Sequence, residues 1–574
     1  MLSVSRRLEV LDDLEDAWIR ADFVPLPVVN IPLDDISYTS SINGALYVLT
    51  GTIWASDKIL RLPVIVPGET LYGGSCLRLA NEISSHHGRR VVKEVDVLEE
   101  SNLLTVISVD IVDNRYSTLV FDFYTADTFE PHPDAARPSM ILKCDPTMNI
   151  VLPLVEAEED ISEYGAAIMD SCGDIVFFVV PNFSTNGMTP LGWPREELLC
   201  CIDWRRGIFS PLRKETTYQS IVSVSFISEN TILIPRGERH CLQLCVLSND
   251  AQGHRVLQTA LYLRLPAMPP RAEISSSTVI RDTSSFTRVG DGPVKLPPIF
   301  ATPASSSVCA VRLIVERHVG TDLQFHTFLL VTHCATLAEI ASGVPANERH
   351  TWLQPAQPHL RVDESTVVES SLPLDDAETP HVQTLESDVW SRRGFMWLDA
   401  GDLAPDASER SWTVHGQRLL GSSAEREESG PALPLRIFDF NPHNTRHFAT
   451  MLLPTVSATS DDEHLRPEDV RGEEGPEVPE EEGSEFGRWT QLPNGNKLTV
   501  VNQPITTPSG GWWRNDLVSD MPFTVTQAAQ TERWSMLTVH GNQILRKRES
   551  SNSVTQHEPM NTTFEVFRIG QGWD

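Results

Sequence analysis

The cysteines of this chain are its most obvious candidates for metal chemistry, but their spacing does not favour a metal site. Cys200 and Cys201 are adjacent, and Cys241 and Cys245 are four residues apart. Residues four apart in a strand share a face but lie about 13 Å apart, which is too far for both thiolates to bind one zinc ion. We therefore expect these cysteines to be buried structural thiols.

Two pairs of histidines are the next candidates for metal ligands. His86 and His87 precede a glycine that indicates a turn, and adjacent residues of a strand point to opposite faces. His443 and His447 could share one face of a helix, but the Asn and Pro residues around them favour a loop. No third ligand is near in the sequence, so we expect no metal at either pair.

Catalytic motifs are missing from the sequence. There is no G-x-S-x-G, Walker loop, G-x-G-x-x-G or H-E-x-x-H. Gly73 and Gly74 precede Ser75, but no helix start follows that could bind a phosphate, so this segment is predicted to be a tight turn. No two carboxylates can be singled out as an acid/base pair without the fold. We therefore predict a protein that is not an enzyme and has no cofactor.

Tryptophans in loop-like sequence are the candidates for partner binding. Trp193 in GWPRE and the pair Trp512 and Trp513 in SGGWWRND follow glycines. Exposed aromatic side chains in loops often anchor protein interfaces. The partner-binding residues remain unknown from the sequence: these three are candidates, and packing beneath their own loops is the favoured interpretation.

The elements that must position these residues are short strands. Runs of apolar and β-branched residues, bounded by Gly, Pro, Asn, Asp or Ser, recur along the chain, for example at 44–51, 103–112 and 240–248. We count roughly two dozen candidate strands from residue 41 onward, and a propeller blade has about four. The prediction is an all-β fold, a six- to seven-bladed β-propeller with seven blades preferred.

A helix is predicted before the strands. In residues 5–20, one stripe recurs at steps of three to four and should dock on the body: Leu8, Leu11, Leu14 or Glu15, and Trp18. Propellers often close by pairing strands from the two ends of the chain. We therefore expect the strand near 45–54 to pair with a strand near 564–569.

Polar stretches interrupt the strands. Residues 266–307 are rich in Pro and Ser, residues 355–390 are polar and acidic, and both are predicted to be long loops. Within 456–490, the run 461–486 has twelve acidic residues and two arginines, so it should be disordered. The predicted organisation is a helix (1–24), the main part of the propeller (25–455), an acidic disordered insertion (456–490) and strands that complete the propeller (491–574).

The charge of the chain limits its partners. It has 78 acidic and 46 basic residues and a formal net charge of −32, which argues against duplex nucleic acid or an anionic membrane as the main partner. A basic protein partner suits this charge. No run of 18 apolar residues predicts a membrane span. The absence of a secretory signal and nine scattered cysteines predict a cytoplasmic or nuclear protein.

Two stretches carry a resemblance to a known family. They are SRRLEVLDDLEDAWIRADF (5–23) and LLCCIDWRRGIFSPL (198–212) with the strand at 224–235. The chain resembles the F-box-type proteins of mushroom-forming fungi, whose C-terminal region is propeller-like, although the F-box itself is missing from this chain. From the residues alone, Ile202 and Trp204 should share a strand face, and a turn should follow in which Gly207 has a positive φ.

The resemblance implies a non-enzymatic protein-interaction module, similar to the substrate-recognition part of F-box proteins. One alternative is a substrate receptor of a cullin-RING ubiquitin ligase whose N-terminal F-box is missing from this chain. The other is an enzyme or ligand-binding propeller with a site in its central channel. That alternative requires acids or histidines that converge at strand starts, and the sequence displays no such set.

Overall fold

The computed structural model describes a large part of the chain. The described residues are 4–25, 29–32, 36–42, 45–50, 58–63, 75–78, 88–98, 101–112, 115–144, 168–182, 195–217, 221, 223–250, 253, 255–282, 306–320, 322–351, 360–362, 367–368, 382–401, 412–421, 435–452, 486, 489–529, 535–540, 543–548 and 561–569. All structural statements below concern these residues.

Strands dominate the described residues, and seven of their sheets have four or more strands. Each sheet has a core of four strands that are antiparallel neighbours. In chain order, the first three sheets consist of β3 (Ile36–Ile42), β4 (Ala45–Thr50), β5 (Lys58–Pro63) and β6 (Ser75–Arg78); β7 (Gly88–Leu98), β8 (Leu103–Val112), β9 (Arg115–Thr125) and β10 (Ser139–Cys144); and β11 (Ile168–Cys172), β12 (Ile175–Asn182), β13 (Arg195–Asp203) and β14 (Ile208–Thr217).

The remaining four sheets follow the same plan. They consist of β15 (Ser225–Ser228), β16 (Thr231–Arg236), β17 (Cys241–Asn249) and β18 (Arg255–Arg264); β19 (Ala272–Arg281), β20 (Val308–Val319), β21 (Asp322–His333) and β26 (Phe395–Gly401); β27 (Trp412–His415), β28 (Arg418–Gly421), β29 (Arg436–Asp439) and β34 (Phe523–Gln527); and β35 (Ser535–His540), β36 (Gln543–Arg548) and β37 (Asn561–Ile569), completed by β1 (Phe23–Pro25) and β2 (Val29–Pro32).

Short elements are added to this plan. Four helices occur among the described residues: α1 (Val4–Arg20), α2 (Cys334–Ser342), α3 (Ser387–Trp390) and α4 (Pro442–Leu452). Additional edge strands are β22 (His350–Thr351), β23 (Leu360–Val362), β24 (Val367–Val368), β25 (Thr384–Leu385) and β30 (Thr490–Gln491). β31 (Lys497–Val501) lies between β34 and β30, and a separate hairpin is formed by β32 (Ile505–Thr507) and β33 (Leu517–Ser519).

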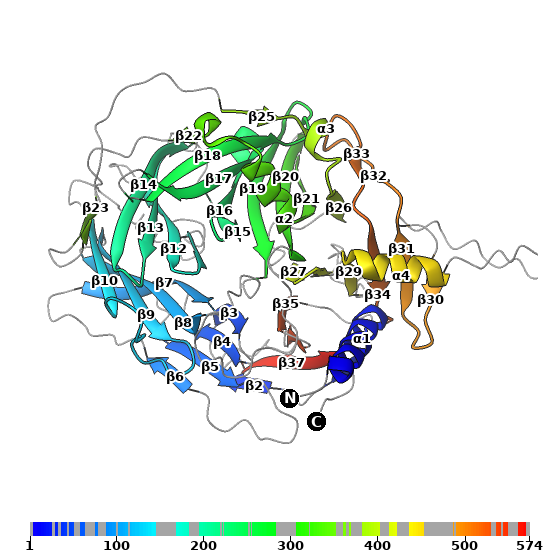
Figure 1. The fold of residues 1–574 in the computed structure, drawn as a ribbon, viewed down its shortest axis with the longest axis horizontal. Helices are drawn as coiled ribbons and strands as arrows, with labels where there is room; N and C mark the ends of the chain where they lie inside the picture. Colours follow the sequence, from blue (N-terminus) through cyan, green and yellow to red (C-terminus); the bar gives the residue numbers. More distant parts are fainter. Residues whose placement is uncertain are drawn as a thin grey trace, which may run out of the picture.

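The sheets are arranged in a circle, with their first strands toward the centre (Figure 1). Contacts join the first strands of successive sheets: β7 to β11, β11 to β15, β19 to β27, β27 to β35 and β35 to β3. A circle of antiparallel sheets is a β-propeller. The predicted all-β propeller fold is therefore confirmed.

Strand β12 shows why uninterrupted apolar runs form these sheets. Its residues Phe177 and Val179 pack in the core between its own sheet and the following sheet, whereas Phe178 and Val180 pack toward the preceding sheet. A strand with both faces buried has no polar alternation. As predicted, Ile202 and Trp204 of the next hairpin lie in one core.

The turn after that hairpin strand is also as predicted. Gly207 has φ +66° in the turn between β13 and β14, which is the left-handed region that favours glycine. The added Cβ of any other residue would lie 3.1 Å from Ala136. This glycine therefore meets both a conformational and a steric requirement.

The two chain ends meet in one sheet, but not through the predicted strand. β37 pairs with β1, with Phe23 opposite Ile569, and with β2, with Val29 opposite Phe564. The prediction that the strand near 45–54 makes this contact was wrong, since β4 pairs with β3 and β5. β1 and β2 each end in a proline, and they lie at the edge of their sheet, where a missing N–H is tolerated.

Two predicted loops contain regular structure. Strand β19 (Ala272–Arg281) lies inside 266–307 and buries Ile274, and its serines and threonines concealed it in the sequence. The 355–390 stretch contributes three short edge strands and α3. The acidic insertion predicted at 456–490 lies outside the described residues, except for Phe486, which is buried, and 489–490.

The segment around His443 is a helix, which corrects the predicted loop. The side chain of Asn441 accepts a hydrogen bond from the backbone N–H of His443 at 3.0 Å, and Pro442 occupies the first helical position. Asn and Pro therefore start helix α4 here, because both are favoured at helix N-termini.

We expect Phe567→Ala to weaken the sheet in which the chain ends meet. Phe567 is buried on β37, and its ring lies 6.3 Å from the ring of Phe23. Truncating a buried Phe costs about 3–5 kcal/mol in free energy of unfolding. Urea denaturation followed by tryptophan fluorescence measures this loss. Leu323→Ala, at an exposed site, is the control and should change stability by less than about 0.5 kcal/mol; an equally small loss for Phe567→Ala would contradict the closure.

Candidate functional site

Helix α1 lies on the rim of the propeller, where two sheets meet. Its residues Ala17 and Trp18 pack in one core with Ile437 of β29 and with Ile544 and Phe567 of the closing sheet. The predicted docking of this helix by an apolar stripe is therefore correct in its second half. Leu8 was wrongly placed in the stripe, because Val10 is the buried side chain in this part of the helix, whereas Leu8 is 56% exposed.

A buried charge cluster holds the middle of α1. The guanidinium of Arg418 donates to Asp439 (Nε to Oδ2, 3.2 Å) and pairs with Glu15 of α1. Asn444 of α4 donates to both carboxylates, at 2.6 Å to Glu15 and 3.0 Å to Asp439. The same guanidinium lies 5.0 Å from the ring centre of Trp18. Each group of the cluster therefore has several partners, as buried ions require.

The pKa values of the two carboxylates differ within this cluster. Burial acts to raise the pKa of Glu15, but the charge and hydrogen bonds of Arg418, with the hydrogen bond of Asn444, outweigh it and lower that pKa. Burial dominates at Asp439 and raises its pKa despite Arg418. Glu15 is thus the carboxylate that stays ionised most firmly.

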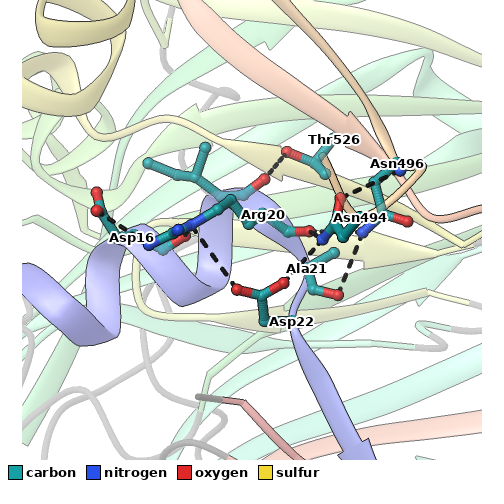
Figure 2. A network of polar contacts seen from close by, with 8 residues as sticks. Asp16, Arg20, Ala21, Asp22, Asn494, Asn496 and Thr526 are labelled. Carbon is teal, nitrogen blue, oxygen red and sulfur yellow. Dashed lines mark hydrogen bonds and ion pairs between the residues drawn. The ribbon is translucent and has the colours of Figure 1, made fainter. Parts of the chain in front are cut away.

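The C-terminal end of α1 is held by side chains from a distant part of the chain (Figure 2). The amide groups of Asn494 and Asn496 donate to the carbonyl of Arg20 at 2.8 and 2.5 Å. The hydroxyl of Thr526 donates to the carbonyl of Ile19 at 2.5 Å. These contacts satisfy carbonyls that a helix end leaves without intrahelical partners.

The opposite face of α1 remains exposed. It carries Leu8, Glu9, Asp12, Asp13 and Asp16, all of which are exposed to solvent. The helix is therefore fixed on one side and presents carboxylates around an apolar side chain on the other. This outward face of α1 is our candidate partner-binding surface.

Two of the three candidate tryptophans are not available to a partner. Trp512 and Trp513 are buried, as in the packing alternative. Trp513 lies 5.4 Å from the ring of Phe328 and 5.6 Å from that of Trp397, and Arg317 lies 4.3 Å above Trp512. They hold the segment around the β32–β33 hairpin against the β19–β26 sheet. Trp193 lies outside the described residues.

The structure brings together a charged set on the inner strands that sequence analysis did not find. Asp170 of β11 accepts hydrogen bonds from Ser225 of β15 (3.1 Å), from the backbone N–H of Phe226 (2.6 Å) and from Arg281 of β19 (2.5 Å). One carboxylate thus links three successive sheets. A charged residue inside an apolar first strand is the only sequence signal for this set, and it does not identify the partners.

Two further carboxyls lie on β7 beside this set. Burial, together with the charge of Asp96, raises the pKa of Glu94 to about 8. Burial and the charge of Asp170 raise the pKa of Asp96 to about 6. Within the part of the chain that the structure describes, no three His, Cys, Asp or Glu side chains are placed to hold a metal ion.

The predicted thiol sites are buried. Cys200 and Cys201 lie in different cores, on opposite faces of β13, and Cys241 and Cys245 are buried in β17. Burial raises the pKa of Cys241 to about 12, which makes its thiol inert at neutral pH.

The two histidine pairs and the glycine pair were the other sites considered from the sequence. His443 and His447 are exposed on α4. His86, His87 and the glycine pair before Ser75 lie outside the described residues.

Comparisons with known proteins give distant structural likenesses. No protein-family model and no curated protein matches the chain. The chain is similar to Hsv2 of Kluyveromyces lactis (10% identity, 40% of this chain and 62% of that chain, TM-score 0.24) and to the WD40 domain of SCAP from fission yeast (10% identity, 73% and 84%, TM-score 0.23). It thus spans less than two thirds of that Hsv2 chain. At such TM-scores the fold assignment depends on the sheets themselves. No helix among the described residues is long and apolar enough to cross a membrane.

We expect Arg418→Met to detach the middle of α1. The change leaves two buried carboxylates without their cation, and breaking a buried ion pair on one side costs about 3–5 kcal/mol. The free energy of unfolding from urea titration measures the loss. Arg6→Met, which breaks an exposed pair on the same helix, is the matched control and should leave the denaturation midpoint unchanged. Equal midpoints for the two variants would refute a docking role for the cluster.

The inner carboxyls predict a pH dependence. The folded state binds the Glu94 proton more tightly than the unfolded chain does, so ionisation of Glu94 removes stability as the pH rises from about 4.5 to about 8. Glu94→Gln should therefore be more stable than the parent at pH 8, by about 1 kcal/mol or more, and similar to it at pH 4. Thermal unfolding at both pH values measures this. The exposed Glu339→Gln is the control and should follow the parent at both; a Glu94→Gln curve that also follows the parent would show that the Glu94 pKa is ordinary.

Proposed function

We propose that this protein is a non-enzymatic protein-interaction module whose partner binds the outward face of α1. The observation that carries the proposal is the two-sided character of this helix. Its inner side is fixed by the Arg418 cluster and by Asn494 and Asn496, and its outer side leaves Leu8 and four carboxylates exposed. We further propose that each of the seven sheets is one blade.

The exposed face fits a basic partner segment with an apolar side chain. A preformed helix does not lose conformational freedom when its partner binds, so little binding energy is spent on ordering it. Burying Leu8 would contribute about 1.5–3 kcal/mol, and the carboxylates around it would favour Lys and Arg in the partner. The net charge of −32 would speed the approach of such a partner.

We propose, more specifically, that the propeller is the substrate-recognition part of an F-box-type receptor. The resemblance of residues 5–23 to the helix that follows the F-box in that family supports this form. Helix α1 would then join the recognition body to a ligase adaptor. Recovery of an adaptor and a cullin with the protein would separate this form from a free-standing interaction module.

A ligand site at the inner strands is the second candidate, and the raised pKa values of Glu94 and Asp96 favour it. The contacts of Asp170 count against it, because both of its oxygens are bonded to groups of the protein itself. We therefore prefer the outward face of α1.

The test compares charge reversal on and off this face. Asp12→Lys/Asp13→Lys should reduce recovery of basic partners by about tenfold in a quantitative pull-down from the source cells. A tenfold loss corresponds to about 1.4 kcal/mol of binding free energy. Asp388→Lys, at an exposed acid on α3, is the matched control and should bind as the parent does. Added salt should weaken binding to the parent. Identical partner recovery by both variants would refute the proposed surface.

A further inference from the structure

Two cysteines outside the proposed surface lie in contact. Cys309 is on β20, and Cys334 is the first residue of α2, directly after β21. The β20–β21 register places Val308 opposite His333, and the backbone N–H of Cys334 donates to the carbonyl of Ser307 at 2.9 Å. Both side chains are buried in the same hydrophobic core. A hydrogen bond between the two thiols is the main influence on the pKa of each.

The surroundings of Cys334 favour its thiolate. It occupies the N-terminus of a nine-residue helix, where the backbone N–H groups stabilise a negative charge. Arg281 is the register partner of Cys309 on the neighbouring strand, so a guanidinium also lies nearby. The hydrogen bond from Cys309, against burial and with the help of Arg281, lowers the pKa of Cys334.

The pKa values of two other buried thiols are raised instead of lowered. Burial raises the pKa of Cys200 well above its usual range and that of Cys241 to about 12. Cys334 thus combines a favoured thiolate with a second thiol within contact, which is the arrangement of an attacking and a resolving cysteine.

We propose that Cys309 and Cys334 form a redox-sensitive pair that hydrogen peroxide converts into a disulfide. The Cys334 thiolate attacks one peroxide oxygen, the O–O bond breaks, and the hydroxide that leaves takes up a proton to form water. The sulfur of Cys309 then attacks the sulfenic sulfur of Cys334. The S–S bond forms, the S–O bond breaks, and hydroxide leaves with the Cys309 proton as a second water. Two thiols are oxidised by two electrons, and one peroxide is reduced to two waters.

Burial makes this pair selective for small oxidants. Both side chains are almost completely inaccessible, so bulky thiol reagents should not reach them in the folded protein. Peroxide is nearly as small as water and enters through local fluctuations. The disulfide would join the start of α2 to β20 and fix the connection that follows β21.

The test uses the reduced, native protein and hydrogen peroxide. After exposure, the protein is denatured in N-ethylmaleimide, digested and analysed by mass spectrometry. We expect a cross-linked peptide containing Cys309 and Cys334 that has lost two hydrogens, formed about tenfold faster than any oxidation of Cys200 or Cys201. Recovery of both residues as maleimide adducts at peroxide levels that oxidise methionines would overturn the proposal.

Variants separate the two roles. Cys309→Ser should leave a sulfenic acid on Cys334 that dimedone labels when the oxidised protein is denatured in its presence, whereas Cys334→Ser should abolish both the cross-link and the label. Cys245→Ser, which replaces a buried thiol of β17, is the matched control and should still form the cross-link. Dimedone labelling of Cys309 in Cys334→Ser would reverse the assigned roles and contradict the proposal. If a variant does not fold, the cross-link in the parent protein decides the outcome.

Discussion

The pairing of the last strand with the first two is the constraint on which the rest of the structure depends. β37 is the third strand of its sheet, and β1 and β2 pair with successive parts of it. Without them the closing sheet would expose the hydrogen-bonding edge of β37. Because α1 ends at Arg20, directly before β1, closure of the circle also brings this helix to the rim.

The Arg418 cluster fixes the orientation of α1 about its own axis as well as its position on the propeller. Apolar packing of Trp18 alone would tolerate small rotations, since it is non-directional. Hydrogen bonds from Arg418 and Asn444 to Glu15 are directional, and they connect α1 to β28 and α4. Burial of these ions is costly, so their contribution is to specify one orientation rather than to add much stability. One orientation means one outward face.

The fold class, α1 and the turn at Gly207 could be predicted from local sequence, because each depends on residues close together in the chain. The pairing of β1 and β2 with β37 could not, because pairing across more than 500 residues leaves no local signal. The same limit hid the Asp170 set and the Arg418 cluster, whose members come from distant strands. Trp512 and Trp513 are buried, as the favoured interpretation of their sequence expected, but their loop-like sequence gave no sign of the neighbouring sheet that covers them.

Hydrogen–deuterium exchange of the intact protein, read by peptide mass spectrometry, tests the central claim that closure and the charge cluster hold α1 as a fixed part of the propeller. We expect the amides of residues 14–20 to exchange as slowly as those of β37, and both segments to lose protection together in Arg418→Met. Exchange of residues 14–20 at the rate of an isolated helix, with β37 still protected, would contradict it.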